Sequence, residues 1–279
     1  MTSTSSHKVA LVTGASSGMG HAFALQLQEA GFTVYGVARR LDRMDDLRSR
    51  GIKTIEMDVT DDASSTAAVK EILAEVGRID VLVNNAGYGS YGPVEDVPLE
   101  EARHQFDVNV FGAARLIQLA LPTMRAQRSG AIINITSMGG KIYTPFGAWY
   151  HATKFAMESF SDCLRLELKP FGINVVIIEP GAIRTEWSSI AADHLQESSA
   201  HGAYADKASK VARSFRSEAA AKQSSPPEVV ARVVVKAATA HRPKTRYAVG
   251  FGAKPLILTR NLISDRAYDS LILRVGGAN

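Results

Sequence analysis

Short apolar runs rich in β-branched residues recur along the first two thirds of the chain. They occupy residues 8–13, 33–38, 54–57, 79–84, 131–136 and 174–178. Between them lie stretches with helical periodicity, at residues 18–30, 41–50, 63–76, 99–128 and 150–168. Each run is apolar on both faces, which is typical of a parallel strand in a sheet that helices cover on both sides. The alternation predicts a doubly wound parallel sheet in a three-layer α/β/α arrangement.

The pattern changes after Thr185. Residues 186–223 are rich in Ala, Ser and charge, and they favour helix without any apolar run. Two interpretations remain open for this segment, a mobile lid over the substrate and an ordinary helical insertion. Pro226-Pro227 predicts the start of a helix that ends near residue 240, and residues 246–249 predict a last strand.

Both ends of the chain differ from the middle. Residues 1–7 are polar, which predicts a disordered tail. Residues 250–279 form a C-terminal extension in which apolar residues alternate with Arg and Asp. Four interpretations of the extension remain open: covering the substrate pocket, touching a membrane surface, packing a subunit, or packing on its own core. We expect residues 8–279 to form a single domain.

Composition and charge narrow the classes of function. The 279 residues are 46% hydrophobic, which is enough for one large core. The net charge of +4 is small and the basic residues are scattered, so we expect no nucleic-acid partner. Cys163 is the only cysteine, which argues against a disulfide or a metal site; we interpret it as a small core residue of a cytoplasmic protein. No stretch approaches the roughly 20 apolar residues of a transmembrane helix, and no secretory signal is present.

A glycine-rich turn follows the first predicted strand. It reads Thr13-Gly14-Ala15-Ser16-Ser17-Gly18-Met19-Gly20. Gly14 permits a tight turn, while Gly18 and Gly20 let a helix and phosphate groups approach the backbone. In a Rossmann-like sheet, this place holds a dinucleotide pyrophosphate against a helix N-terminus. The turn therefore predicts a dinucleotide site, with chance glycines in a turn as the alternative.

The residues after the second strand indicate which dinucleotide is bound. An acidic residue here would bind the ribose of NAD, but the chain has Ala38, Arg39 and Arg40. A guanidinium pairs with the 2′-phosphate that NADP carries and NAD lacks. We therefore expect NADP(H) in preference to NAD(H), with Arg39 as the phosphate ligand and Arg40 as a solvated charge. Asp42 is interpreted as an N-terminal helix cap.

A tyrosine and a lysine lie four residues apart at the start of a predicted helix. Tyr150 and Lys154 fall on one face of this helix, within reach of each other. Ser137 follows the fifth strand, and Asn84-Asn85-Ala86-Gly87 ends the fourth, at the sheet edge where ligands bind. Adjacent helical residues point in different directions, so we interpret His151 as structural or exposed.

These motifs together resemble the short-chain dehydrogenase/reductase family, in its common form with a C-terminal extension. The resemblance covers residues 8 to about 185 and rests on the glycine turn, Asn84-Asn85-Ala86-Gly87 and the Tyr150/Lys154 pair. It extends to further residues in the family's order and spacing: Asp58, Asn109, Ser137, Pro180, Gly181, Ile183 and Thr185. Residues 246–250 look like members that act on steroids and retinoids.

The resemblance implies hydride transfer between a nicotinamide and a carbonyl or secondary alcohol. Tyr150 would exchange the proton with help from Lys154, Ser137 would orient the substrate oxygen, and Asn109 would hold a water in the proton relay. Lowering a tyrosine pKa from 10 to about 7 requires roughly 4 kcal/mol, which an ammonium and an oxidised nicotinamide supply in a dry pocket. Taken alone, Ser137 equally suits a strand-end cap, and Asn109 a hydrogen bond within its helix.

The resemblance also assigns residues to the cofactor. Asp58 would contact the adenine amino group, and the loop after the sixth strand would line the nicotinamide. Asn84 is instead interpreted as a sheet-stabilising residue. The expected cofactor contacts are Gly14, Ser16, Ser17, Gly18, Met19, Gly20, Arg39, Asp58, Val59, Asn85, Ala86, Gly87, Tyr150, Lys154, Pro180, Gly181, Ile183 and Thr185.

Two other functions remain open, an NAD-dependent alcohol dehydrogenase and a catalytically idle protein that binds the nucleotide as a sensor. The intact set of Ser137, Tyr150 and Lys154 argues against the sensor.

The substrate and the assembly are less closely defined. Apolar residues at 143–149 and near Trp187 favour a bulky apolar substrate, or else belong to the core. By resemblance, residues 99–128 and 150–168 form the interface of a homodimer, and a tetramer is a further alternative.

Overall fold

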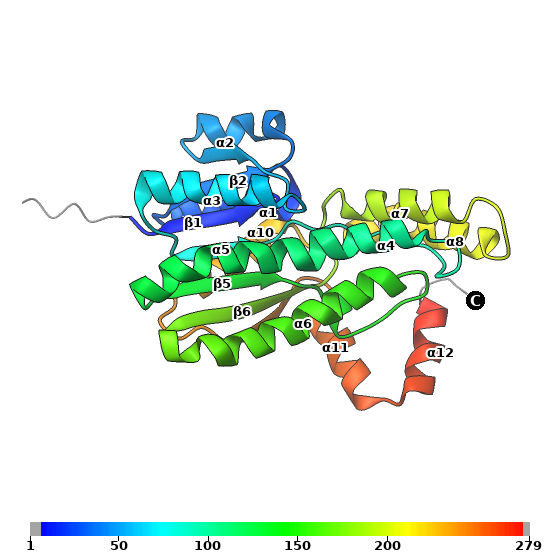
Figure 1. Cartoon of the computed structure of the whole chain (residues 1–279). Helices are drawn as coiled ribbons and strands as arrows, with labels where there is room; N and C mark the ends of the chain where they lie inside the picture. Colours follow the sequence, from blue (N-terminus) through cyan, green and yellow to red (C-terminus); the bar gives the residue numbers. More distant parts are fainter. Residues whose placement is uncertain (1–6, 276–279) are drawn as a thin grey trace, which may run out of the picture.

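A seven-stranded parallel sheet runs through a computed structural model that describes residues 7–275 (Figure 1). The strand order is β3-β2-β1-β4-β5-β6-β7. The strands are β1 Val9–Thr13, β2 Thr33–Ala38, β3 Lys53–Glu56, β4 Val81–Asn84, β5 Gly130–Ile135, β6 Ile173–Pro180 and β7 Arg246–Val249. Every predicted strand is present within one or two residues at most of its bounds, and the doubly wound α/β prediction is confirmed.

Helices cover both faces of the sheet. One layer packs Phe23, Leu47 and Val234 against it, from α1 (Gly18–Glu29), α2 (Asp45–Ser49) and α10 (Pro227–Thr239). The other packs Ile72, Leu116 and Leu164, from α3 (Asp62–Val76), α5 (Gly112–Gln127) and α6 (Ala148–Leu168). The order reverses between β1 and β4, so the loops after these strands diverge and leave a ligand site at the carboxyl edge.

The expectation that each strand is apolar on both faces is wrong for β3. The central strands β1 and β4 are buried throughout, whereas every residue of β3 is half-buried or exposed. The strand order explains the difference, because β3 forms an edge of the sheet and has a neighbour on one side only.

Two predicted helices are interrupted. Residues 41–50 form a 3₁₀ turn at Leu41–Met44 followed by α2, and Asp42 lies in that turn without a capping hydrogen bond, so its interpretation as a cap is wrong. Residues 99–128 divide into α4 (Leu99–Phe106), a π-helical turn at Asp107–Phe111, and α5. A π turn adds a single residue to a helix, which barely changes the periodicity of a long sequence window.

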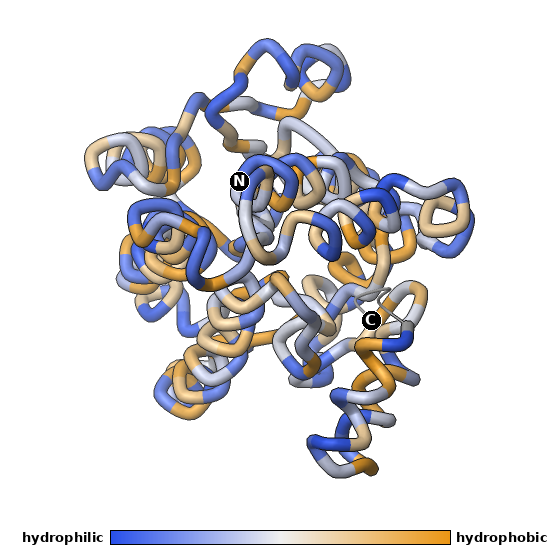
Figure 2. Tube along the Cα trace, turned by 90° about the vertical axis from the view of Figure 1, so that its right-hand side faces the viewer, coloured by the Kyte–Doolittle hydropathy of each residue, from blue (hydrophilic) through white to orange (hydrophobic). Residues whose placement is uncertain are grey.

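The two segments beyond the common core are helical. Residues 186–223 form α7 (Trp187–Ser198), α8 (Ala205–Phe215) and α9 (Glu218–Gln223), and α7 and α8 lie side by side at the carboxyl end of the sheet (Figure 1). The extension forms α11 (Ala253–Leu262) and α12 (Asp265–Val275), which project from the body and alternate hydrophobic and hydrophilic stretches (Figure 2).

The C-terminal helices are anchored on the chain's own core. Tyr268 and Ile272 of α12 are buried against Ile142, in the loop that follows β5. Most of the predicted tail, residues 1–6, and residues 276–279 of the extension lie outside the described residues.

Candidate active site

The two ends of the glycine turn between β1 and α1 pack closely against each other. Gly14 and Gly18 have positive φ angles of 67° and 54°, where other residues are strained. A Cβ on Gly20 would lie 2.2 Å from the carbonyl oxygen of Gly14, and one on Gly18 would lie 3.1 Å from Cγ2 of Thr185. The turn therefore exposes bare backbone at a helix N-terminus, beside the loop after β6, and this surface fits a dinucleotide pyrophosphate.

Thr13, which the sequence reasoning did not select, joins this turn to the loop after β4. Its Oγ1 accepts hydrogen bonds from the backbone N–H groups of Asn85 and Ala86, both at 2.9 Å. The side chain of Asn85 donates to the carbonyl oxygen of Thr13 at 2.9 Å. Asn84 instead donates to Oδ1 of Asn134 at 2.8 Å, a buried contact of the kind expected for a sheet-stabilising residue.

Arg39 and Asp58 lie near each other at the ends of β2 and β3. The Arg39 side chain is exposed, so its charge is free to meet a phosphate. Partial burial raises the pKa of Asp58, but hydrogen bonds from Thr60 and the nearby Arg39 charge outweigh it, and the net pKa is lowered. Asp58 therefore remains a charged acceptor beside a solvated guanidinium.

Ser137, Tyr150 and Lys154 come together at the carboxyl end of β5. The Ser137 hydroxyl faces the Tyr150 hydroxyl closely enough to lower the pKa of Tyr150. The Lys154 Nζ atom lies 5.9 Å from the centre of the Tyr150 ring and donates to the carbonyl oxygen of Ile135 at 3.1 Å. A phenol, a hydroxyl and an ammonium thus converge in one buried place, as their spacing predicts.

Burial shifts the pKa values of this group in opposite directions. It raises the pKa of Tyr150 to about 12, against a smaller lowering by the Ser137 hydrogen bond. It lowers the pKa of Lys154 to about 8, while the negative charge of Glu158 acts in the raising direction. Protein groups alone therefore do not bring the pKa of Tyr150 toward 7, because desolvation of the phenolate dominates.

Asn109 lies in the π turn between α4 and α5. Its Oδ1 accepts from the backbone N–H of Tyr88 at 3.1 Å, and its Nδ2 donates to the Tyr88 carbonyl and to Thr153 Oγ1, both at 3.0 Å. Thr153 follows Tyr150 on α6, and a Cβ on Gly87 would lie 2.9 Å from Asn109 Oδ1 and 3.7 Å from Lys154 Nζ. The π turn therefore places Asn109 beside Lys154; its part in a proton relay stays a prediction.

Aromatic side chains cover Tyr150. The Trp187 ring of α7 lies 5.1 Å from the Tyr150 ring and 5.7 Å from the Tyr91 ring, measured between centres. Phe215 of α8 packs against Tyr91 at 5.3 Å. We call these four residues the aromatic cluster. Within the expected apolar region 143–149, Tyr143 packs instead on Tyr268 of α12, 5.0 Å away, because the loop after β5 turns toward the C-terminal helices.

His151 is structural, one of the two alternatives expected for it. It is 6% exposed, and its Nδ1 lies 2.8 Å from the carbonyl oxygen of Gly139. Its Nε2 accepts from the backbone N–H of Thr144 at 3.1 Å. The ring therefore pins the loop after β5 to α6, and burial lowers its pKa.

A set of buried charges lies behind Lys154, and the sequence reasoning missed it. Two of its members are carboxylates that are almost inaccessible to solvent, and they pack around a guanidinium from β7. We call this set the Glu158 cluster; it consists of Lys141, Glu158, Asp162, Glu179 and Arg246. The only sequence signal is that Glu158 follows Lys154 by one helical turn.

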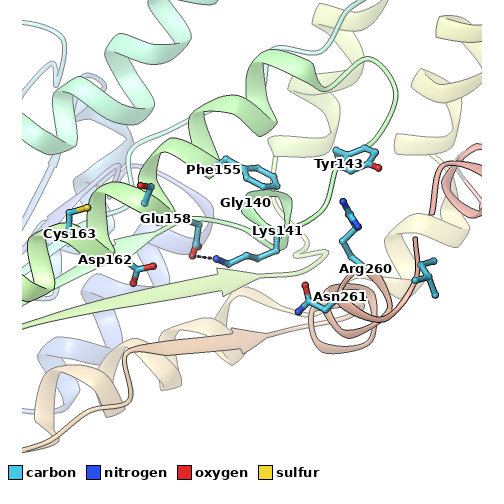
Figure 3. Close-up of a pocket in the computed structure, with 11 residues that line it drawn as sticks. Gly140, Lys141, Tyr143, Phe155, Glu158, Asp162, Cys163, Arg260 and Asn261 are labelled. Atoms are coloured by element: carbon cyan, nitrogen blue, oxygen red, sulfur yellow. Dashed lines mark ion pairs between the residues drawn. The ribbon is translucent and has the colours of Figure 1, made fainter. Parts of the chain in front are cut away.

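A cavity of about 760 Å³ opens beside the Glu158 cluster, between α6 and α11 (Figure 3). Phe155, Arg260 and Asn261 line it, and the ion pair between Lys141 and Glu158, 3.0 Å long, forms its floor. Cys163 is exposed on its wall, so the interpretation of Cys163 as a core residue is wrong. Position 163 faces away from the sheet, because Leu164 and not Cys163 is the buried residue of that turn.

Glu179 is expected to make stability depend on pH. Burial raises its pKa from 4.5 to about 7, and its Oε1 lies 3.5 Å from Arg246 Nε without a hydrogen-bond partner among the described residues. An acid with a raised pKa destabilises the fold increasingly as pH rises from its unfolded to its folded value. Glu179→Gln should therefore gain stability relative to the parent chain by up to about 3 kcal/mol more at pH 8 than at pH 5. Urea unfolding at both pH values measures this, and an equal difference at the two would contradict it.

Comparisons with known proteins place this site in context. A family model described as short chain dehydrogenase matches residues 8–196. The chain belongs to the short-chain dehydrogenase family. A probable short-chain type dehydrogenase/reductase, VdlC of Helicobacter pylori, is 35% identical over 263 residues, or 94% of this chain and 96% of that protein. A 3-ketodihydrosphingosine reductase of Bacteroides thetaiotaomicron is 41% identical over 178 residues, or 64% of this chain and 65% of that protein.

Solved short-chain dehydrogenase structures share the whole fold. One from Streptomyces avermitilis is 36% identical and covers 99% of both chains with a TM-score of 0.80. One from Burkholderia phymatum in complex with NAD is 26% identical, with a TM-score of 0.77 and 92% of each chain covered. Actinorhodin polyketide ketoreductase with NADPH is 29% identical, with a TM-score of 0.72 over 86% of this chain and 94% of that one.

The family defines the general chemistry of the chain. It is an oxidoreductase that acts on a carbonyl or alcohol group of a small molecule with a nicotinamide cofactor. Within residues 7–275, no helix combines the length and the hydropathy needed to cross a bilayer.

Proposed function

We propose that the chain is an NADP(H)-dependent carbonyl reductase in which Tyr150 exchanges the proton. The observation that supports this most directly is the convergence of Ser137, Tyr150 and Lys154 at the sheet edge that also carries the glycine turn. A protein that only sensed the nucleotide would have no need of this buried set.

Ser137, Tyr150 and Lys154 each have a separate role in the reduction. When bound, the cofactor supplies the hydride that adds to the carbonyl carbon. Ser137 donates a hydrogen bond to the carbonyl oxygen and holds it beside the Tyr150 hydroxyl. The Tyr150 proton moves to that oxygen as negative charge develops on it, and the nearby Lys154 ammonium stabilises the phenolate that remains.

The aromatic cluster favours a bulky apolar substrate. Tyr91 and Trp187 pack on the Tyr150 ring, and Phe215 packs on these two. Helices α7 and α8 add Ala191, Leu195 and Val211 to the same buried group. Such a wall offers much apolar area and few polar anchors. The relative whose name specifies a 3-ketodihydrosphingosine substrate acts on a molecule of this kind. Substrate reaches Tyr150 only if Trp187 moves aside, so α7 and α8 act as the lid.

A panel of ketones and aldehydes tests the function. The panel should contain small polar, aromatic and long-chain members at matched concentration, with the loss of NADPH absorbance as the readout. We expect kcat/KM to rise with apolar size. Failure of every carbonyl to consume either NADPH or NADH, in protein that binds the nucleotide, would reject the reductase and favour a sensor.

Arg39 sets the preference for NADP(H) in this proposal. Its exposed guanidinium follows β2, and no carboxylate occupies the place that binds the NAD ribose. Arg39→Asp should raise KM for NADPH by about tenfold to a hundredfold, the loss of one charge-assisted phosphate contact plus repulsion. KM for NADH should change by less than about threefold or improve. The neighbouring Arg40→Asp is the matched control, and an unchanged ratio of the two cofactors in Arg39→Asp would remove Arg39 from the site.

We also propose a homodimer through α4, α5 and α6. Four large apolar side chains of these helices and of the π turn between α4 and α5 are exposed: Leu99 at 54%, Phe111 at 60%, Phe155 at 44% and Leu166 at 69%. Light scattering on the purified chain should give twice the monomer mass.

A further inference from the structure

The end of β5 is joined to α6 by consecutive hydrogen bonds. Residues 134 to 136 each bond to a different residue of the helix, and together these bonds span two of its turns. The pairs, from strand to helix, are Asn134 with Ser161, Ile135 with Lys154, and Thr136 with Glu158. The next residue, Ser137, faces Tyr150. Lys154 belongs to one of these three pairs and Ser137 directly follows the last of them, so the register of strand and helix decides where the catalytic atoms lie.

Glu158 is the only charged acceptor in this series of pairs. Its Oε1 accepts from Thr136 Oγ1 at 2.6 Å, and its Oε2 lies 3.0 Å from both Lys141 Nζ and Arg246 Nε. Its side chain is 4% exposed. A Cβ on Gly140 would lie 2.9 Å from Glu158 Cγ, so the loop after Ser137 rests directly on this side chain. One carboxylate thus contacts β5, the loop after it, and β7.

We propose that Glu158 is a positioning residue, whose buried carboxylate holds the end of β5 and its loop against α6 so that Ser137, Tyr150 and Lys154 keep their reactive geometry. The inference rests on the proposed function, because it assumes that these three residues carry out the reduction. It assigns to Glu158 no contact with substrate or cofactor.

The charge of Glu158 also acts on Lys154. Charged groups face Glu158 from four elements: Lys141 from the loop after β5, Arg246 from β7, Glu179 from β6, and Asp162 and Lys154 from α6 itself. Burial lowers the pKa of Lys154 to about 8, and Glu158 opposes that lowering. Since reduction requires the ammonium form, activity should fall as pH rises through the pKa of Lys154. Loss of the Glu158 charge should move that fall to lower pH.

Glu158→Gln tests the role through the pH profile of kcat/KM. The alkaline limb of the profile is the pH range in which kcat/KM falls as pH rises. In Glu158→Gln the midpoint of this limb should lie about 1 pH unit lower, because one nearby opposite charge is removed, while KM for NADPH stays within about twofold. Glu158→Asp keeps the charge and should restore the limb. Asp162→Asn, which removes another carboxylate of the Glu158 cluster without the link to β5, is the matched control and should leave the limb in place. A limb that stays unmoved in Glu158→Gln, or moves equally in Asp162→Asn, would overturn the proposal.

Thr136→Val separates geometry from charge. It removes the hydroxyl that bonds Glu158 and also lies 3.1 Å from the Ile178 carbonyl oxygen, and it leaves every charge, so kcat should fall about tenfold with no change in the pH at which activity is lost. Full kcat in this variant would overturn the positioning role, and the result does not depend on whether Glu158→Gln folds.

A readout without turnover distinguishes this inference from the function on which it rests. In protein labelled with ¹³C-lysine, the Lys154 signal, assigned by its loss in Lys154→Met, should titrate near pH 8 and about 1 unit lower in Glu158→Gln. A shifted signal in a protein that reduces no carbonyl would reject the reductase but keep the coupling. An unshifted signal in an active reductase would reject the coupling alone.

Discussion

Tyr150→Phe is expected to lower kcat/KM for carbonyl reduction by about 10²- to 10⁴-fold, the usual contribution of a positioned general acid. The substitution deletes one hydroxyl and keeps the ring that packs 5.1 Å from Trp187, so the aromatic cluster should remain intact. The loss should fall on kcat, because the proton is needed only as charge develops on the substrate oxygen. Steady-state consumption of NADPH, with the best carbonyl of the panel, measures it.

The matched control for this variant is Tyr247→Phe. Tyr247 lies on β7, where its hydroxyl accepts a hydrogen bond from the backbone N–H of Lys244, far along the sheet from the glycine turn. Its kcat/KM should stay within about twofold of the parent chain, because this half-buried hydroxyl lies outside the proposed site. NADPH affinity, from fluorescence titration, should be unchanged in both variants. If Tyr150→Phe kept more than a tenth of the parent activity, another group would have to be the proton donor.

Arg246→Met is expected to lower the free energy of unfolding by about 3 kcal/mol, because it removes the cation that pairs with the buried Glu179 and one of the two cations that contact Glu158. Arg246 bonds Glu158 at 3.0 Å, pairs with Asp162, and lies 3.5 Å from Glu179. Methionine keeps most of the apolar stem, so the loss comes from the charge. The melting temperature should fall by roughly 5–10 °C for a chain of this size.

Two further variants test that explanation. The exposed Arg242, in the loop before β7, provides the control, and Arg242→Met should change stability by less than about 0.5 kcal/mol. Adding Glu179→Gln to Arg246→Met should recover part of the loss, since one buried carboxylate is then neutral. A stability loss equal to that of the control would mean that the buried carboxylates do not depend on Arg246.

The sheet was the most predictable part of the fold. A central parallel strand is apolar on both faces, and this property can be read from a few consecutive residues of β1, β4, β5 or β6. Edges are harder, because β3 differs from its neighbours through its place in the strand order and not through any strong local signal. The π turn at Asn109 stayed hidden for a related reason, since one extra residue in a long helix leaves the apolar stripe almost unbroken.

The site was predictable wherever its residues share one element or one sheet edge. Tyr150 and Lys154 stand one helical turn apart, and the carboxyl ends of parallel strands meet, so Ser137 could be placed with them. The Glu158 cluster could not be derived in this way. The ion pair between Glu158 and Arg246 joins residues 88 positions apart, on a helix and an edge strand that the sequence does not place side by side. The prediction that Cys163 is a core residue was wrong for a local reason, because a small apolar residue on an amphipathic helix fits either face.

The indole of Trp187 rests on the ring of Tyr150, and the chain has only one other tryptophan, Trp149. If α7 and α8 act as the proposed lid, a molecule that reaches the phenol must first displace that indole into different surroundings. Trp187 is therefore an intrinsic fluorescent probe next to the proposed catalytic tyrosine. In a chain with Trp149 replaced by Phe, stopped-flow emission would time the arrival and departure of ligands separately from the redox step, without any attached dye.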